Sequence, residues 1–160
     1  MTPTESKTAS DTTAAMDTKG CSILVVDDNE QNRELLVAYL EELQCEVRTA
    51  GDGFAALDAV KAKRPDIVLL DVMMPRMSGY QACAKMRADR ANAAMPIVMV
   101  TALNEVADME RAVDAGADDF LTKPVNKVEL LTRVRSLLRV SVLQKQLMRT
   151  EEEIKRLGGG

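Results

Sequence analysis

Short apolar runs alternate with polar, helix-patterned segments along most of the chain from Cys21 onward. The runs read SILVVDD, CEVRTA, DIVLLD, PIVMVTA and DFLTKP, in that order. The apolar parts SILVV, IVLL and IVMV are continuous rather than alternating, which is typical of strands that helices cover on both faces. We therefore predict five buried strands.

The segments between these runs have a helical period and predict helices over residues 29–43, 52–63, 79–89 and 104–115. A last helix is predicted to begin near Asn126. Four glycines (51, 53, 79 and 116) lie at the junctions, where turns need them. Strands that alternate with helices predict an α/β fold, with a doubly wound five-stranded parallel sheet and right-handed crossovers.

The composition narrows the class of protein. Hydrophobic residues make up 46% and charged residues 29% of the 160 residues, as in soluble globular proteins. Aromatic residues are only 2%, so the core must be aliphatic and base stacking has almost no side chains to use. Histidine is absent, which excludes Ser/His and Cys/His catalytic pairs, histidine zinc sites and a histidine phosphodonor.

The termini and cysteines predict a cytoplasmic protein with no membrane partner. No stretch approaches the roughly 18 apolar residues of a transmembrane helix. Residues 1–20 are polar, lack the apolar centre of a signal peptide and are predicted to be a disordered leader of unknown role. The odd number of cysteines and their spacing indicate reduced thiols. The final glycines, residues 158–160, predict a flexible tail.

Polar residues directly follow the apolar runs. They are Asp27, Asp28, Asp71, Thr101 and Lys123. In a doubly wound sheet the carboxyl ends of the strands meet at one edge, where ligands bind, so these side chains are expected to converge. Two carboxylates about 4 Å apart repel by on the order of 4 kcal/mol at an effective dielectric of about 20, so such a site needs a cation.

Mg²⁺ suits this set of groups, because it prefers hard oxygen ligands and keeps some positions for water and phosphate oxygens. Mn²⁺ or Ca²⁺ are expected substitutes. A carboxylate, a metal, the Lys123 ammonium and the Thr101 hydroxyl suffice for phosphoryl transfer, which needs mainly alignment and charge stabilisation. We hypothesise in-line attack by Asp71 on phosphorus. A single aspartate at a strand end is usually a cap, but five polar strand ends argue against that alternative.

The motifs ILVVDD, LLDVMMPRMSGY, VMVTA and DDFLTKP, in this order, resemble the receiver domains of bacterial two-component response regulators. The resemblance covers residues 21–139. It implies a flavodoxin-like sheet of order 2-1-3-4-5 and a phosphoacceptor at Asp71, with a sensor histidine kinase or phosphotransfer protein as donor. It also implies a signalling domain that assists its own phosphorylation rather than an enzyme.

The resemblance further implies a metal site. Asp28 and Asp71 are similar to the family's direct metal ligands, together with the backbone carbonyl of Met73. Asp27 is expected to act largely through water.

Around the phosphoryl group, the resemblance implies that Thr101, Ala102 and Lys123 bind its oxygens. The peptide between Lys123 and Pro124 is expected to be cis, an isomer that proline makes accessible. Thr101 and Phe120 resemble the family's switch pair, in which the hydroxyl moves to the phosphoryl group and the ring turns inward. The alternative is that Phe120 is simply a core residue.

The last helix is predicted to continue past Arg139, because residues 140–157 contain neither proline nor glycine. Residues along this extension recur at spacings of three and four, as in a coiled-coil seam: Val140, Leu143, Leu147, Thr150, Ile154 and Leu157. We predict a homodimer through this stripe, the alternative being a single helix packed on its own domain. Basic residues between 127 and 149 are interpreted as a solvated face, the alternative being a phosphate-binding patch. With a net charge of -4, no nucleic-acid partner is predicted.

The extension resembles the stalks that join receivers to diguanylate cyclase or HD-type phosphodiesterase domains. The chain is therefore interpreted either as a regulatory fragment of a larger cyclic-di-GMP enzyme or as a stand-alone regulator of an effector protein. A structural dimerisation module without phosphorylation is a further alternative. An aspartyl-nucleophile phosphatase is disfavoured, because Met73 stands where such an enzyme has its second aspartate. The sequence leaves the kinase, the signal and the effector open.

Overall fold

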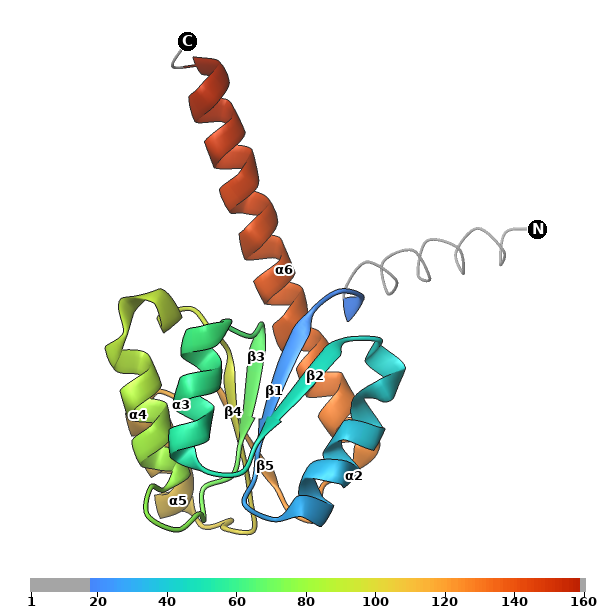
Figure 1. Ribbon diagram of the computed structural model, residues 1–160, viewed down its shortest axis with the longest axis vertical. Coiled ribbons are helices and arrows are strands. Elements are labelled where there is room, and N and C mark those ends of the chain that lie inside the picture. The colour runs from blue at the N-terminus through green and yellow to red at the C-terminus, as the bar shows by residue number, and fades with distance from the viewer. Residues whose placement is uncertain (1–17, 159–160) are drawn as a thin grey trace, which may run out of the picture.

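The computed structural model describes residues 18–158, which form one parallel sheet between two layers of helices (Figure 1). The strand order is β2-β1-β3-β4-β5, so the predicted fold class and order are confirmed. The strands are β1 (Ser22–Val26), β2 (Glu46–Ala50), β3 (Ile67–Leu70), β4 (Ile97–Thr101) and β5 (Asp119–Thr122). The predicted leader lies outside the described residues, except for residues 18–20, where the Thr18 carbonyl accepts hydrogen bonds from the Cys21 amide and the Cys45 thiol.

The helices begin where polar side chains cap them. They are α2 (Glu30–Leu40), α3 (Gly53–Ala62), α4 (Gly79–Ala88), α5 (Val106–Ala115) and α6 (Lys127–Gly158), with short 3₁₀ turns η1 (Glu41–Leu43) and η2 (Arg90–Asn92). Asn29 and Asp52 accept amide hydrogen bonds from the first turns of α2 and α3. The sequence pattern predicts both residues as the first residues of their helices, but in the structure they are the caps that precede them. Likewise, α5 begins two residues later than predicted, after its cap Glu105.

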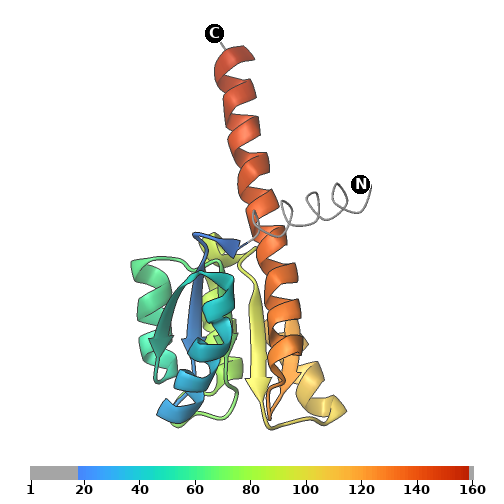
Figure 2. The ribbon, with the colours of Figure 1, turned by 90° about the vertical axis from the view of Figure 1, so that its right-hand side faces the viewer.

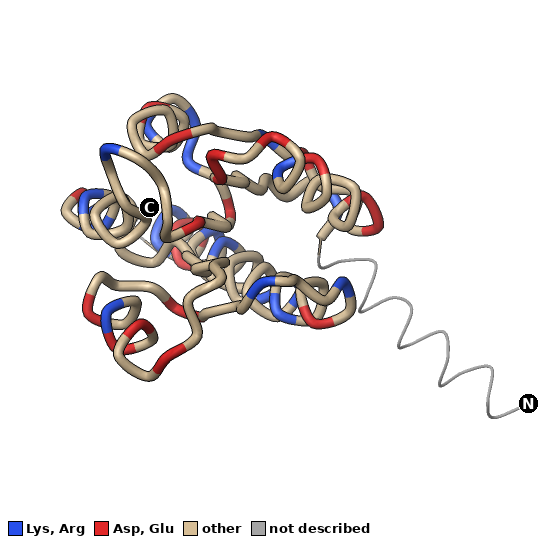
Figure 3. The backbone as a smooth tube through the Cα atoms, turned by 90° about the horizontal axis from the view of Figure 1, so that it is seen from below, with Lys and Arg blue, Asp and Glu red and all other residues tan. Residues whose placement is uncertain are grey.

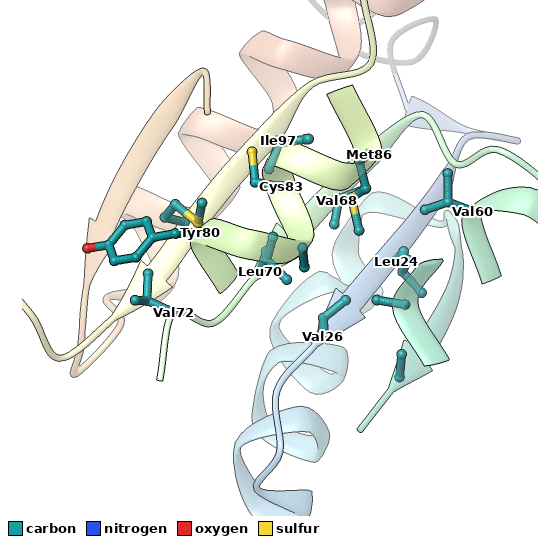
Figure 4. Packing of buried hydrophobic residues seen from close by; sticks show 14 of the residues in the cluster. Leu24, Val26, Val60, Val68, Leu70, Val72, Tyr80, Cys83, Met86 and Ile97 are labelled. Carbon is teal, nitrogen blue, oxygen red and sulfur yellow. The ribbon is translucent and has the colours of Figure 1, made fainter. Parts of the chain in front are cut away.

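Each face of the sheet has its own hydrophobic core, and this explains the continuous apolar runs. Helices α3, α4 and α5 cover one face, and α2 and α6 cover the other (Figures 1 and 2). On the first face, Leu24 and Val26 belong to the same core as Met86 (Figure 4). On the second face, Ile23 and Val25 belong to the other core. Alternate residues of one strand therefore enter opposite cores.

Helix α6 is 32 residues long and has two parts with different environments. Its first turns pack on the sheet through Leu130, Leu131, Val134 and Leu138, all buried. It then continues past the edge where the strands begin (Figures 1 and 2), and its side chains from Leu143 onward are exposed. The predicted tail begins at Gly158, which is the last residue of α6; residues 159–160 lie outside the described part. None of the described helices has both the length and the apolar character needed to span a membrane.

Candidate metal and phosphoacceptor site

Three carboxylates meet at the carboxyl ends of β1 and β3. Val26 pairs with Leu70 in the register of these strands, so the residues that follow, Asp27 and Asp71, are neighbours. Together with Asp28 they offer carboxylate oxygens that lie within 4.8 Å of one another. Asp27 and Asp71 are buried, whereas Asp28 is exposed. Figure 3 looks onto this edge of the sheet from below, with acidic positions red and basic positions blue.

Main-chain hydrogen bonds hold the two buried carboxylates in place. The Asp71 amide donates to the Val26 carbonyl at 2.9 Å, which extends the pairing of β3 with β1. The Met73 amide donates to Asp71 Oδ1 at 3.3 Å, and the Asn29 amide donates to Asp27 Oδ1 at 2.9 Å. Each carboxylate therefore has one oxygen fixed by the loop that follows it.

Lys123 reaches the same cluster from the end of β5. Its Nζ lies 2.8 Å from Asp27 Oδ2 and 3.5 Å from Asp71 Oδ2, so one ammonium group bridges both buried carboxylates. The lysine side chain is 21% exposed, which leaves it accessible from the surface. The peptide between Lys123 and Pro124 is cis.

The electrostatics of the cluster favour a further positive charge. The pKa of the Asp71 carboxyl is raised above its ordinary value, first by burial and then by the negative charges of Asp27 and Asp28. The Lys123 ammonium and the hydrogen bond from the Met73 amide act in the opposite direction and lower this pKa. The net direction is upward, so the ammonium group does not fully offset the desolvation and the like charges. Three carboxylate oxygens at this spacing are hard ligands that fit a divalent cation such as Mg²⁺.

The remaining predicted residues flank the cluster. Thr101 ends β4 and is fully buried, and its hydroxyl accepts a hydrogen bond from the Leu103 amide at 3.3 Å. Phe120 is half-buried and packs, like Leu103, against the core under α4 and α5. Ala102 is exposed, and so is the Met73 side chain.

Sequence reasoning missed two structural contributors to this site. Arg33 donates from Nη1 to the Asp27 carbonyl at 2.8 Å and so ties α2 to the loop that bears Asp27 and Asp28. Its position one helical turn after the cap Asn29 was a signal that could have identified it. Gly79 approaches so closely that a Cβ there would lie 2.2 Å from the Asp71 carbonyl oxygen. The sequence pattern predicts only a turn at this glycine.

Together, the parallel sheet and the acidic cluster define a class of phosphoacceptor domains, and the comparisons agree. Residues 23–135 match the response regulator receiver domain, and the chain belongs to this family. Receivers are signalling phosphoacceptors rather than catalysts. They bind Mg²⁺ at an acidic pocket and interact with histidine kinases or phosphotransfer proteins.

Individual relatives show how far the similarity extends. The chain is 45% identical over 136 residues to the response regulator PleD of Caulobacter vibrioides, covering 85% of this chain and 30% of PleD. A putative response regulator from Chloroflexus aurantiacus superposes with a TM-score of 0.72 and 34% identity, over 75% of this chain and 98% of that structure. A further similar structure is the receiver domain of the Pseudomonas aeruginosa sensor histidine kinase PA1611, solved with a magnesium ion in its active site cleft. It superposes with a TM-score of 0.69 and 32% identity, over 74% of this chain and 98% of that structure. The chain thus spans less than a third of PleD.

Proposed function

We propose that Asp71 accepts a phosphoryl group from a sensor histidine kinase or a phosphotransfer protein, in a reaction that depends on Mg²⁺. The observation that supports this most directly is the cluster of Asp27, Asp28 and Asp71 within 4.8 Å, with Lys123 bridging its two buried members. The magnesium ion in the PA1611 receiver supports the same choice of metal.

In the proposed reaction, a carboxylate oxygen of Asp71 forms a bond to phosphorus while the bond from phosphorus to the donor's imidazole nitrogen breaks. The electron pair of that bond leaves with the donor. Asp28 and Asp71, with the Met73 carbonyl, would hold the metal, and Asp27 would act through water; when bound, Mg²⁺ supplies charge neutralisation for the phosphoryl oxygens. The ionised carboxylate needs no general base.

Lys123, Thr101 and Ala102 are proposed to bind the transferred group. The Lys123 ammonium already lies 3.5 Å from Asp71 and would pair with a phosphoryl oxygen attached there. The Thr101 hydroxyl now accepts a hydrogen bond from the Leu103 amide. It would move away from this amide and donate a hydrogen bond to a phosphoryl oxygen. Phe120, half-buried beside Leu103, would then turn inward as the second member of the switch.

The test is incubation of the chain with acetyl phosphate and Mg²⁺, followed by intact-mass measurement and peptide mapping. We expect one added phosphoryl group, located on the peptide that contains Asp71, when Mg²⁺ is present, and no added group when EDTA is present from the start of the incubation. A chain that stays unmodified with Mg²⁺, or is modified elsewhere, would contradict the proposal and favour a structural module that has kept only the receiver shell.

A groove next to the site supports a protein as phosphodonor. It lies between α2 and the segment after β5, and is lined by Leu35, Leu36 and Tyr39 opposite Pro124 and Val125. Lys123 also lines this groove, so an apolar partner helix seated there would bring its phosphohistidine close to Asp71. The location that fits such a donor is the cytoplasm, and the lack of a disulfide among the described cysteines is consistent with it.

The largely exposed extension of α6, residues 140–157 and called the stalk below, is proposed to form a homodimer. Its seam residues are exposed in one copy: Val140 47%, Leu143 56%, Leu147 58%, Ile154 64% and Leu157 76%. A second copy that packs along the seam would remove these apolar side chains from water. The stalk would then transmit the change caused by phosphorylation to an output domain or an effector protein. An output domain is compatible with the match to PleD, of which this chain covers 30%.

Replacing Leu147 with aspartate is expected to shift the chain toward monomer and raise the dimer dissociation constant by about tenfold or more, because a charge would enter the seam. Sedimentation equilibrium measures the change. Met148→Asp adds the same charge at an exposed position on the other side of the helix and serves as the control. Equal dissociation constants for the two variants would show that the seam is not the contact.

A further inference from the structure

Asp66 is a buried carboxylate at the edge of the sheet opposite Asp71, and the phosphoryl chemistry does not use it. The two strands that bring Asp27 beside Asp71 at one end bring Ser22 beside Asp66 at the other. Asp66 Oδ2 accepts a hydrogen bond from the Ser22 amide at 2.7 Å, and the residue is 8% exposed. A charge buried to this extent needs compensation.

That compensation comes from α6. The Lys145 ammonium pairs with Asp66 Oδ1, and the Ser141 hydroxyl lies 3.5 Å from the same oxygen. Ser141 and Lys145 are four residues apart and therefore share one face of the helix. Both lie beyond residue 135, where the match to the receiver family ends.

The Asp66–Lys145 pair differs from the ion pairs that Lys127 and Arg133 make on α6. The acidic partners of Lys127 and Arg133 are at least 28% exposed, whereas the Asp66 side chain is 9% exposed. Exposed pairs contribute little, but a buried carboxylate that loses its cation is left uncompensated. The Lys145 side chain is 56% exposed, which moderates the expected effect.

The pair also determines which side of α6 faces away from the receiver. At about 100° per residue, Val134, Leu138, Ser141 and Lys145 lie on one side of the helix, toward the sheet. Val140, Leu143 and Leu147 lie on roughly the opposite side, and all three are exposed. A rotation of α6 that broke the contact with Asp66 would turn this apolar stripe toward the receiver's own surface.

We propose that Asp66, Ser141 and Lys145 form an ionic latch that holds residues 139–148 of α6 against the amino-terminal edge of the sheet. The latch fixes the rotation of the stalk, so that its apolar stripe faces outward to a second copy of the chain. The orientation toward a second copy rests on the dimer proposed above, whereas the latch itself does not.

Amide hydrogen exchange tests the latch without any phosphoryl donor. In Lys145→Met, exchange in residues 140–148 is expected to accelerate about fivefold, while residues 128–138 keep their protection through the buried leucines. Lys155→Met makes the same substitution in the exposed part of the stalk and should leave both segments unchanged. Each variant is also made with Leu147→Asp, so that a difference in dimer content does not account for the result.

Asp66→Asn provides a second, independent route, because asparagine keeps an acceptor for the Ser22 amide and removes only the charge. Its effect on residues 140–148 should match that of Lys145→Met, and the double variant should add little to either. Equal exchange in Lys145→Met and Lys155→Met, or fully additive effects of the two latch variants, would overturn the proposal. Failure of acetyl phosphate labelling would overturn the phosphoacceptor assignment and leave these exchange results unaffected.

Discussion

Asp71→Asn is expected to abolish uptake of a phosphoryl group and at the same time to stabilise the metal-free protein. The variant lacks the nucleophilic carboxylate, so labelling by acetyl phosphate should fall below detection. The same change removes one of three carboxylates whose oxygens lie within 4.8 Å of one another. Ionisation of the Asp71 carboxyl is unfavourable in the folded protein, mainly because the group is buried. We expect the free energy of unfolding without Mg²⁺ to rise by about 1–2 kcal/mol.

The pH dependence of this gain follows from the direction of the Asp71 pKa. Burial raises the folded-state pKa above the ordinary value of 3.8, so the folded state binds the proton more tightly than the unfolded state. Ionisation of Asp71 therefore costs stability as the pH rises from about 3.8 through the raised folded-state pKa. The gain of Asp71→Asn over wild type should be small below this window and complete above it.

Urea unfolding of both proteins at several pH values in EDTA measures the difference. Asp114→Asn, which changes an exposed carboxylate on α5, is the control and should leave the free energy of unfolding nearly unchanged. Saturating Mg²⁺ should then stabilise wild type and leave Asp71→Asn much less affected. A variant less stable than wild type at neutral pH without metal would show that the cluster is not repulsive.

Gly79→Ala is expected to lower the free energy of unfolding by about 3 kcal/mol, a large part of the stability of an ordinary domain. A Cβ at this position would lie 2.2 Å from the Asp71 carbonyl oxygen and 2.8 Å from Val72 Cα. Both are backbone atoms and cannot move aside as a side chain can. The start of α4 would have to retreat from the loop that bears the phosphoacceptor, so the rate of phosphorylation should fall as well.

Gly53→Ala is the matched control for this substitution. A Cβ at Gly53 would also be crowded, at 2.6 Å, but by the sulfur of Met77, whose flexible side chain can give way. Urea unfolding should therefore show a clearly smaller loss for Gly53→Ala. Equal losses for the two variants would mean that backbone crowding at Gly79 is not what requires the glycine.

The sequence predicted the sheet and the convergence at its edge, because both follow from local patterns. Continuous apolar runs such as SILVV indicate doubly covered strands, and the topology of parallel strands then brings their carboxyl ends together. The proximity of Asp27, Asp28 and Asp71 followed from these two facts alone. The structure adds the register of β1 with β3 that makes Asp27 and Asp71 neighbours.

Contacts between distant segments could not be predicted from such patterns. Asp66 precedes β3 in the same way that many turn residues precede strands, and no periodicity links it to Lys145, 79 residues later. The crowding at Gly79 likewise depends on how closely α4 packs on the β3 loop. Helix starts were displaced by one or two residues because caps and first-turn residues look alike in sequence. The helix predicted over residues 29–43 ends at Leu40, and its last three residues form the 3₁₀ turn η1 instead.

Because α6 is continuous, a small tilt near the sheet produces a larger displacement at the far end of the helix. From Leu138, the last fully buried leucine, to Leu157 the helix extends about 28 Å. With the contact between Asp66 and Lys145 open, a tilt of about 10° at Leu138 would swing the tip of α6 by about 5 Å, roughly the rise of one helical turn. A rearrangement too small to disturb the hydrophobic core can thus displace the far end of α6 by about the length of a side chain.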